Sequence, residues 1–228
     1  MKTSLFATSL LALALVAPLA QAHKAGDIIV RAGAITVDPH ESSSDIWVGA
    51  LGTDVAGTKA TLDSDTQLGL NFAYMVTDHV GVELLAATPF SHDVGVAGMP
   101  GAFAGLNGKL GELKHLPPTL SVVYYPMDAS SAFQPYLGAG INYTWFFDTE
   151  LSSEAEDKGF SGLDMDDSWG LAAQIGMDYM LTDNIMLNAQ VRYIDIDTTG
   201  TTSFGGREVK VDVDVDPYVY MVGLGYKF

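Results

Sequence analysis

The sequence predicts an all-β protein, an eight-stranded antiparallel transmembrane β-barrel. Eight segments alternate apolar residues with small or polar ones, aromatic residues gather near the ends of the apolar faces, and short turns alternate with long links. Alternation with a period of two gives a strand two unlike faces. Aromatic residues at both ends of an apolar band are typical of membrane interfaces, which favours a membrane barrel over a soluble β-sandwich or a lipocalin-like barrel.

Composition agrees with strands that face lipid. Of the 228 residues 48% are apolar, and mean hydropathy is +0.19. The chain nevertheless carries 28 acidic residues against 11 basic ones, a net charge of -17. Binding of nucleic-acid phosphates needs a basic surface, so no nucleic-acid partner is expected. The chain has no cysteine, which excludes disulfide bonds.

Residues 1–22 read as a secretory signal peptide rather than as part of the fold. Lys2 gives a positive start, residues 5–16 are apolar, and Ala20 and Ala22 flank Gln21 in the small-x-small form of a cleavage site. The apolar run is shorter than the roughly 20 residues of a membrane-spanning helix. We therefore expect one barrel domain over residues 23–228.

The first four predicted strands lie between residues 28 and 125. Residues 28–37 alternate weakly. In residues 68–76 the even positions, from Leu68 to Val76, are apolar. In residues 80–87 the even positions, from Val80 to Ala86, are apolar as well. Residues 119–125 form a second weak segment. The even positions of the two stronger segments are predicted to face lipid.

The last four predicted strands alternate more clearly. In residues 137–147, 169–179 and 185–193 every odd position is apolar, and in residues 218–228 every even position is apolar. Each segment has about the length that crosses a bilayer when tilted. A closed barrel pairs every backbone group within lipid, whereas an open sheet leaves its edges unpaired.

The connections set the predicted orientation. Residues 77–79, 126–134 and 181–184 form short turns, and residues 38–66, 88–117, 148–167 and 195–216 form long links that hold most of the acidic residues. In bacterial outer-membrane barrels the short turns lie in the periplasm. We therefore expect both termini in the periplasm and the long links outside the cell, at the level of the lipopolysaccharide.

The C-terminus carries a pattern of its own. Gly223, Tyr226 and the terminal Phe228 form a Gly-x-x-aromatic-x-aromatic pattern. It resembles the signal that the barrel-assembly machinery reads, so we expect these residues to be an assembly signal.

The residues predicted to point inward divide the lumen into a charged part and an apolar part. The charged residues are expected to form a polar plug of ion pairs between opposite walls, since an unpaired buried charge is costly: Arg31, Glu83, Asp178 and Arg192. Towards the outer mouth the inward residues are apolar: Ile35, Leu85, Ala87, Phe146 and Ile194. These five residues either pack the lumen or line a pocket for an apolar solute, and both readings stay open.

Catalysis is not expected. The five histidines are His23, His40, His79, His92 and His115. None pairs with an inward Ser and Asp at a strand end, as a catalytic triad would need. We expect no cofactor and no catalytic metal.

The two ends of the last long link carry five aspartates. Their positions continue the lipid-facing alternation of the adjoining strands: Asp195, Asp197, Asp212, Asp214 and Asp216. If both flanking strands extend without a bulge, all five carboxylates share an outward face. They would then bind a divalent cation that bridges to lipopolysaccharide, or they would only keep a strand edge soluble. The sequence favours the second reading.

Four motifs carry a resemblance to a known family. They are LLAATPF at 84–90, HLPPTL at 115–120, PYLGAGINY at 135–143 and YIDIDT at 193–198. With the rest of residues 25–228 they resemble the OmpW family of outer-membrane proteins. The resemblance implies an eight-stranded barrel in the Gram-negative outer membrane, with a narrow, partly hydrophobic channel for small apolar molecules. It also raises a lateral opening in the wall as an exit.

The expected function is therefore passive translocation of small hydrophobic solutes across the outer membrane. The expected neighbours are outer-membrane lipid and lipopolysaccharide. The alternative is a structural or adhesive barrel whose acidic extracellular links bind partners. Transport depends on lumen residues, whereas adhesion depends on the links alone.

Overall fold

In the computed structural model, which describes residues 22–228, eight antiparallel strands close into a barrel. Around the barrel they follow the order β1 (Ile28–Asp38), β6 (Asp65–Met75), β7 (Val80–Ala87), β10 (Thr119–Tyr124), β11 (Phe133–Leu151), β13 (Ser168–Met180), β14 (Ile185–Ile194) and β17 (Tyr218–Lys227). Pairing of β1 with β17 and of β10 with β11 leaves the ring without a free edge. The predicted fold class is confirmed, and the predicted strands match the observed ones to within a few residues at most ends.

The long links fold into strands of their own, which the sequence did not predict. On one side β5 (Lys59–Leu62), β8 (Phe90–Ala97) and β9 (Gly108–Leu116) continue the barrel wall beyond β11. On the other side a second sheet contains β3 (Ile46–Val48), β4 (Thr53–Val55), β12 (Phe160–Met165), β15 (Asp197–Phe204) and β16 (Arg207–Asp214), with β2 (Ser42–Ser43) paired to β16. A 3₁₀ helix (Gly101–Leu106) and α1 (Ser153–Asp157) complete this part of the chain, which we call the extension.

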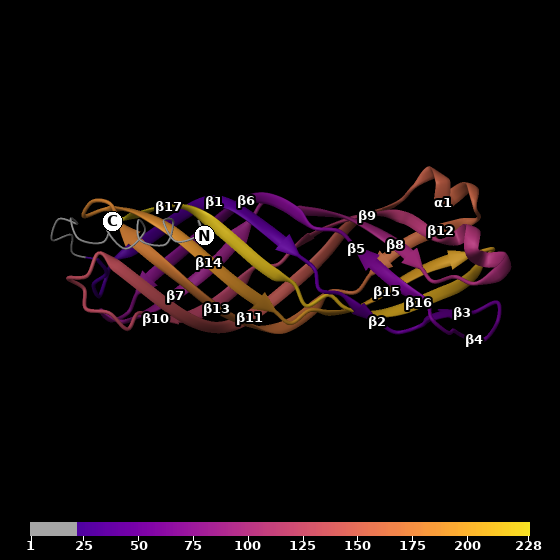
Figure 1. The fold of residues 1–228 in the computed structure, drawn as a ribbon, viewed down its shortest axis with the longest axis horizontal. Coiled ribbons are helices and arrows are strands. Elements are labelled where there is room, and N and C mark those ends of the chain that lie inside the picture. The colour runs from indigo at the N-terminus through magenta and orange to yellow at the C-terminus, as the bar shows by residue number, and fades with distance from the viewer. Residues whose placement is uncertain (1–21) are drawn as a thin grey trace, which may run out of the picture.

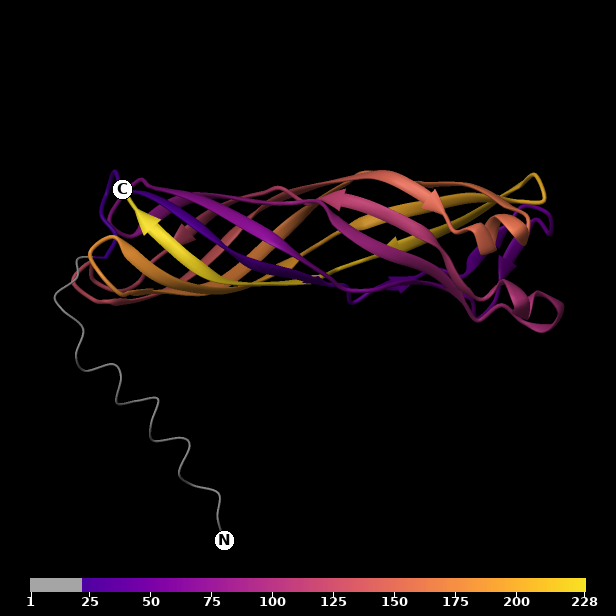
Figure 2. The same ribbon diagram turned by 90° about the horizontal axis from the view of Figure 1, so that it is seen from above.

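Barrel and extension lie end to end in an elongated molecule (Figure 1). The barrel strands are tilted against the long axis, and the C-terminus lies at the end opposite the extension (Figure 2). Within residues 22–228 no helix is long and apolar enough to cross a membrane.

The barrel is apolar outside and polar inside over much of its length. Ile175 and Val222, on its outer face, are 67% and 65% exposed. Near the extension Tyr143 and Trp169 are paired in register, with ring centroids 4.7 Å apart. At the opposite end lie Tyr226 and Phe228, also 4.7 Å apart. These rings mark the two edges of the lipid-facing band.

Close strand approach explains one glycine of the predicted assembly signal. Gly223 pairs with Gly33 between β17 and β1. A Cβ atom on Gly223 would lie 2.1 Å from the carbonyl oxygen of Ala32, and one on Gly33 would lie 2.2 Å from that of Val222. Only residues without a side chain fit here, so Gly223 has a packing role whatever its part in assembly.

Candidate functional site

Charged and polar side chains centred on Arg31 fill the part of the lumen away from the extension, which we call the lower lumen. Its Nη2 donates to Asp178 Oδ2 over 2.6 Å and its Nε donates to Asp178 Oδ1 over 3.0 Å. Its Nη1 donates to Glu83 Oε2 over 3.2 Å and to Asn71 Oδ1 over 2.9 Å. One guanidinium from β1 thus ties together β6, β7 and β13.

Arg192, on β14, completes the group from the wall opposite Glu83. Its Nη2 donates to Glu83 Oε1 over 2.7 Å, and its Nε donates to Gln174 Oε1 over 2.8 Å. Gln174 Nε2 in turn donates to Glu83 Oε1 over 2.8 Å. The structure therefore brings all four predicted plug residues into one network, and each is at most 1% exposed. Two cations face two anions, so the buried charges balance.

Several plug members were not predicted. His23 Nε2 lies 2.9 Å from Asp178 Oδ2, and the Tyr125 hydroxyl accepts from Arg31 Nη2 over 2.7 Å. Asn188 Nδ2 donates to Asp178 Oδ1 over 2.9 Å. Asn188 could have been found from its inward phase on β14. His23 precedes the first strand, so no periodic pattern indicates where its side chain lies.

Above the plug the interior turns apolar. Fifteen buried residues from the barrel and the extension form one contiguous cluster, which we call the apolar column. The column contains Ile35, Leu85, Phe146 and Ile194, and Ala87 packs against it. All five predicted pocket residues are therefore brought to the same region.

The column continues into a cavity between the two sheets of the extension. The cavity has a volume of about 60 Å³, and Val94, Met165 and Val213 belong both to its lining and to the column. Ile46 and Phe160 also line it. Apolar side chains thus extend from the middle of the extension to the level directly above the plug.

Beside the column, a stretch of the wall lacks strand pairing. The register between β6 and β7 ends at Gly69 and Ala87, and the register between β5 and β8 begins only at Leu62 and Val94. Pro89, within this stretch, has no backbone N–H to offer.

Side chains close this stretch, which we call the seam and define as residues 63–67 facing residues 88–93. Each contact joins the two sides: Ser91 N donates to Asp65 Oδ2 (2.8 Å), Asp93 N to Asp63 Oδ1 (2.7 Å) and Thr88 Oγ1 to Gln67 Oε1 (3.0 Å). Side-chain contacts of this kind can be released without breaking a strand ladder.

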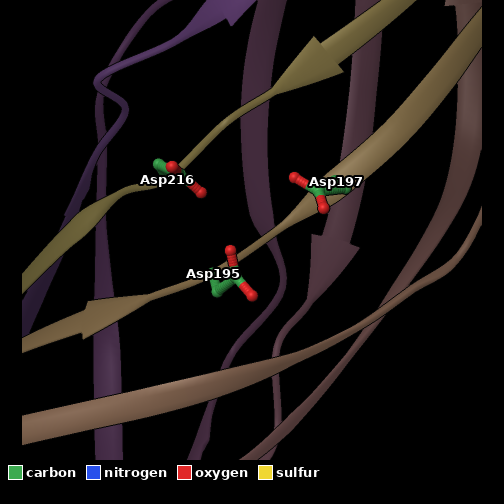
Figure 3. Close-up of side chains that lie close together, drawn as sticks. All are labelled: Asp195, Asp197 and Asp216. Carbon is green, nitrogen blue, oxygen red and sulfur yellow. The ribbon is translucent and has the colours of Figure 1, made fainter.

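Three of the acidic residues beyond the barrel, where the extension begins, lie close together. The chain leaves regular pairing between β14 and β15, and Asp216 has φ +40°. As a result the carboxylates of Asp195, Asp197 and Asp216 converge to within 4.8 Å (Figure 3). Burial, together with the neighbouring carboxylates, raises the pKa of Asp197.

The other two members of the expected row lie outside this trio. Asp212 Oδ1 accepts from Thr199 Oγ1 over 3.0 Å, and Asp214 Oδ2 accepts from Ser42 Oγ over 3.2 Å. Asp214 also pairs in register with Asp197. The intervening Ile196, Val213 and Val215 are buried, so the aspartates keep the outward parity that the sequence predicted, and a bridging cation stays a prediction.

Fold and lumen together define a class of protein: an outer-membrane β-barrel with an apolar interior above a charged plug. The chain belongs to the OmpW family, whose sequence model matches residues 24–228. This confirms the resemblance, and it identifies the chain as a protein of the Gram-negative outer membrane.

Relatives support this assignment over nearly the whole chain. Outer membrane protein W of Vibrio cholerae serotype O1 is 48% identical over 207 residues, which cover 91% of each chain. The crystal structure of the outer membrane protein OprG from Pseudomonas aeruginosa is 55% identical, with a TM-score of 0.86, over 91% of this chain and 98% of that one. A more distant relative is the dibenzothiophene metabolism operon protein PahQ of Pseudomonas aeruginosa, 26% identical over 178 residues and 78% of each chain.

Proposed function

We propose that the protein passively translocates small apolar molecules across the outer membrane. A solute enters the cavity of the extension, moves along the apolar column, and stops above the plug. It then leaves sideways through the seam into the membrane. No chemical step is involved. The extension faces the cell exterior beside lipopolysaccharide, and the termini face the periplasm.

The observation that carries this proposal is the change of chemistry along one continuous interior. The column and the cavity share apolar residues, so an apolar solute loses contact with water along this path. The plug bars the straight route, because entering it would break paired buried charges. Apart from the backbone hydrogen bond from Thr88 N to Leu68 O, contacts to side chains hold the seam in place of a strand ladder, so it is the exit that we expect to cost least.

The name of one relative agrees with this substrate class. PahQ is named after dibenzothiophene metabolism, and dibenzothiophene is a flat apolar molecule. We infer similar chemistry for the solute of this chain, without assigning that compound.

Substitution of Leu85 tests the proposal. Leu85 is 3% exposed and lies in the column. We expect Leu85→Asp to reduce the uptake of radiolabelled naphthalene by cells to the rate of cells that lack the protein, because a carboxylate in the column binds water and repels an apolar solute. Leu85→Met, which keeps an apolar side chain of similar volume, should retain uptake. Unchanged uptake by Leu85→Asp, at equal amounts of folded barrel, contradicts the proposal.

The alternative is a structural or adhesive barrel. The observation in its favour is the exposed carboxylate surface of the extension, of which Asp212 and Asp214 are examples. Adhesion predicts that neutralising these residues abolishes partner binding, while Leu85→Asp leaves it intact. Leu85→Asp and the variant with Asp212 and Asp214 neutralised therefore separate the two functions.

We also propose that the C-terminal residues Gly223, Tyr226 and Phe228 are recognised by the barrel-assembly machinery. Tyr226, on the outer face of β17, is 45% exposed, and Phe228, directly after β17, is 70% exposed. Rings exposed at the end of a strand are available for recognition before the barrel inserts.

A further inference from the structure

The inner wall of the column carries a row of three stacked rings where the barrel meets the extension. His115 on β9 pairs in register with Phe90 on β8 and with Phe146 on β11. The ring centroids of His115 lie 5.4 Å from Phe90 and 5.6 Å from Phe146, with interplanar angles of 29° and 28°. The imidazole therefore lies between two apolar rings within the column.

A second imidazole ties this row to the seam. His92 Nε2 lies 2.9 Å from His115 Nε2, and His92 Nδ1 lies 2.6 Å from the backbone carbonyl oxygen of Asp63. His92 and His115 are only 2% and 5% exposed. The other charged groups nearby are the carboxylates of Asp63 and Asp65, which belong to the seam.

With both rings neutral, the partners fix the proton on each ring nitrogen. A carbonyl oxygen can only accept, so His92 Nδ1 carries a hydrogen and donates to Asp63. In a neutral imidazole the other nitrogen is then an acceptor, so His92 Nε2 accepts from His115 Nε2. His115 Nδ1 is left with a lone pair, and it is buried without a hydrogen-bond partner.

The neutral form of His115 persists at ordinary pH. β9 lies in the extension, outside the lipid-facing band. Burial, with a smaller effect of His92, lowers the pKa of His115 to about 3. The ring therefore keeps its lone pair, and with it the ability to accept a hydrogen bond, at neutral pH.

We propose that His115 Nδ1 is a hydrogen-bond acceptor for the solute, and that the preferred solutes are apolar molecules with one hydroxyl or ring N–H group. This deepens the proposed function and rests on it. A buried acceptor without a partner is unfavourable. A solute with a donor satisfies it, whereas a wholly apolar solute leaves it unpaired, and sites of this kind discriminate against ligands that lack the polar group.

A matched pair of probes tests the inference. Indole has a ring N–H, and benzofuran has nearly the same shape and no donor. For the protein in lipid nanodiscs, measured by equilibrium dialysis, we expect indole to bind about fivefold more tightly than benzofuran, the effect of one neutral hydrogen bond. His115→Phe, which keeps the ring stack, should bring the two affinities together and leave benzofuran binding unchanged. His79→Phe, at the opposite end of the barrel, should leave the preference intact.

Nitrogen NMR keeps the test valid if His115→Phe fails to fold. With only five histidines, the imidazole signals of ¹⁵N-labelled wild-type protein can be resolved. Indole should shift the Nδ1 signal of His115, and benzofuran should not. Equal affinities in the wild type, a preference that survives His115→Phe, or an Nδ1 signal that indole does not move would each overturn the inference. If neither probe binds, or if Leu85→Asp leaves the binding of both unchanged, the proposed function itself fails.

Discussion

At the scale of single residues, Glu83 holds the plug together. Its carboxylate accepts hydrogen bonds from Arg31, Arg192 and Gln174. Glu83→Gln leaves two buried guanidinium groups with one anion fewer. We expect it to lower the free energy of unfolding by about 3 kcal/mol, measured by urea titration of the protein in lipid vesicles.

A second substitution and a surface control sharpen this prediction. Arg192→Gln added to Glu83→Gln restores the charge balance, because Arg31 keeps Asp178 as its partner. The double variant should therefore regain part of the lost stability. Glu112→Gln, at an exposed pair with Lys109, should leave the free energy of unfolding almost unchanged. Equal losses for Glu83→Gln and Glu112→Gln would mean that the plug is not a stabilising network.

The titration of His115 makes stability depend on pH. Its pKa is about 3 in the folded protein, against 6.5 for a free imidazole, so the unfolded chain binds the proton more readily. Stability is then complete above about pH 6.5 and falls as the pH drops towards 3. Between pH 7 and pH 5 the loss should be about 2 kcal/mol.

His115→Phe provides the comparison, since other groups titrate in the same range. The free energies of unfolding from urea titrations at pH 7 and pH 5 should differ in this variant by about 2 kcal/mol less than they do in the wild type. The same pH dependence in both proteins would show that His115 is not the buried neutral group described above.

At the scale of elements, strand β17 combines a packing requirement with a proposed recognition signal, and the two can be separated. Gly223→Ala places a methyl group against the backbone of Ala32, so it should impair refolding from urea into detergent, where no assembly machinery is present. Gly225→Ala meets mainly the flexible side chain of Met186 and should refold better.

Phe228→Ala should behave in the opposite way. Its ring is exposed, so we expect normal refolding in detergent and a reduced amount of folded barrel in the outer membrane of cells. Heat-modifiable migration on gels measures both quantities. Normal assembly of Phe228→Ala in cells would contradict the role of this residue as a signal.

The elements that the sequence predicted are those with an uninterrupted period of two. The barrel strands keep this period because one face meets lipid along their whole length. Several of the extension strands do not, although β15 and β16 pair without a shift. Their ladders shift register between Val94 and Gly95, between Phe147 and Glu150, and between Ser161 and Leu163. Each shift exchanges the two faces of the strand, so alternation is lost and acidic strands resemble loops.

At the scale of the whole molecule, the same parity argument located the plug and part of the column, because an inward residue can be recognised from its outward neighbours. It did not reveal contacts between distant segments. His23 and Asp178 are 155 residues apart, and the pairing of His92 with His115 depends on two extension strands whose existence the sequence did not indicate.

The central claim is that an apolar solute leaves the column through the seam, and a reversible cross-link across the seam tests it most directly. The chain has no cysteine, so an introduced pair reacts alone. Gln67→Cys with Thr88→Cys replaces a hydrogen-bonded pair across the seam, and Thr36→Cys with Thr66→Cys replaces one between regularly paired strands. Oxidation of the first pair should stop naphthalene uptake and reduction should restore it, while the second pair has no effect. Full uptake with the seam pair oxidised would contradict the account.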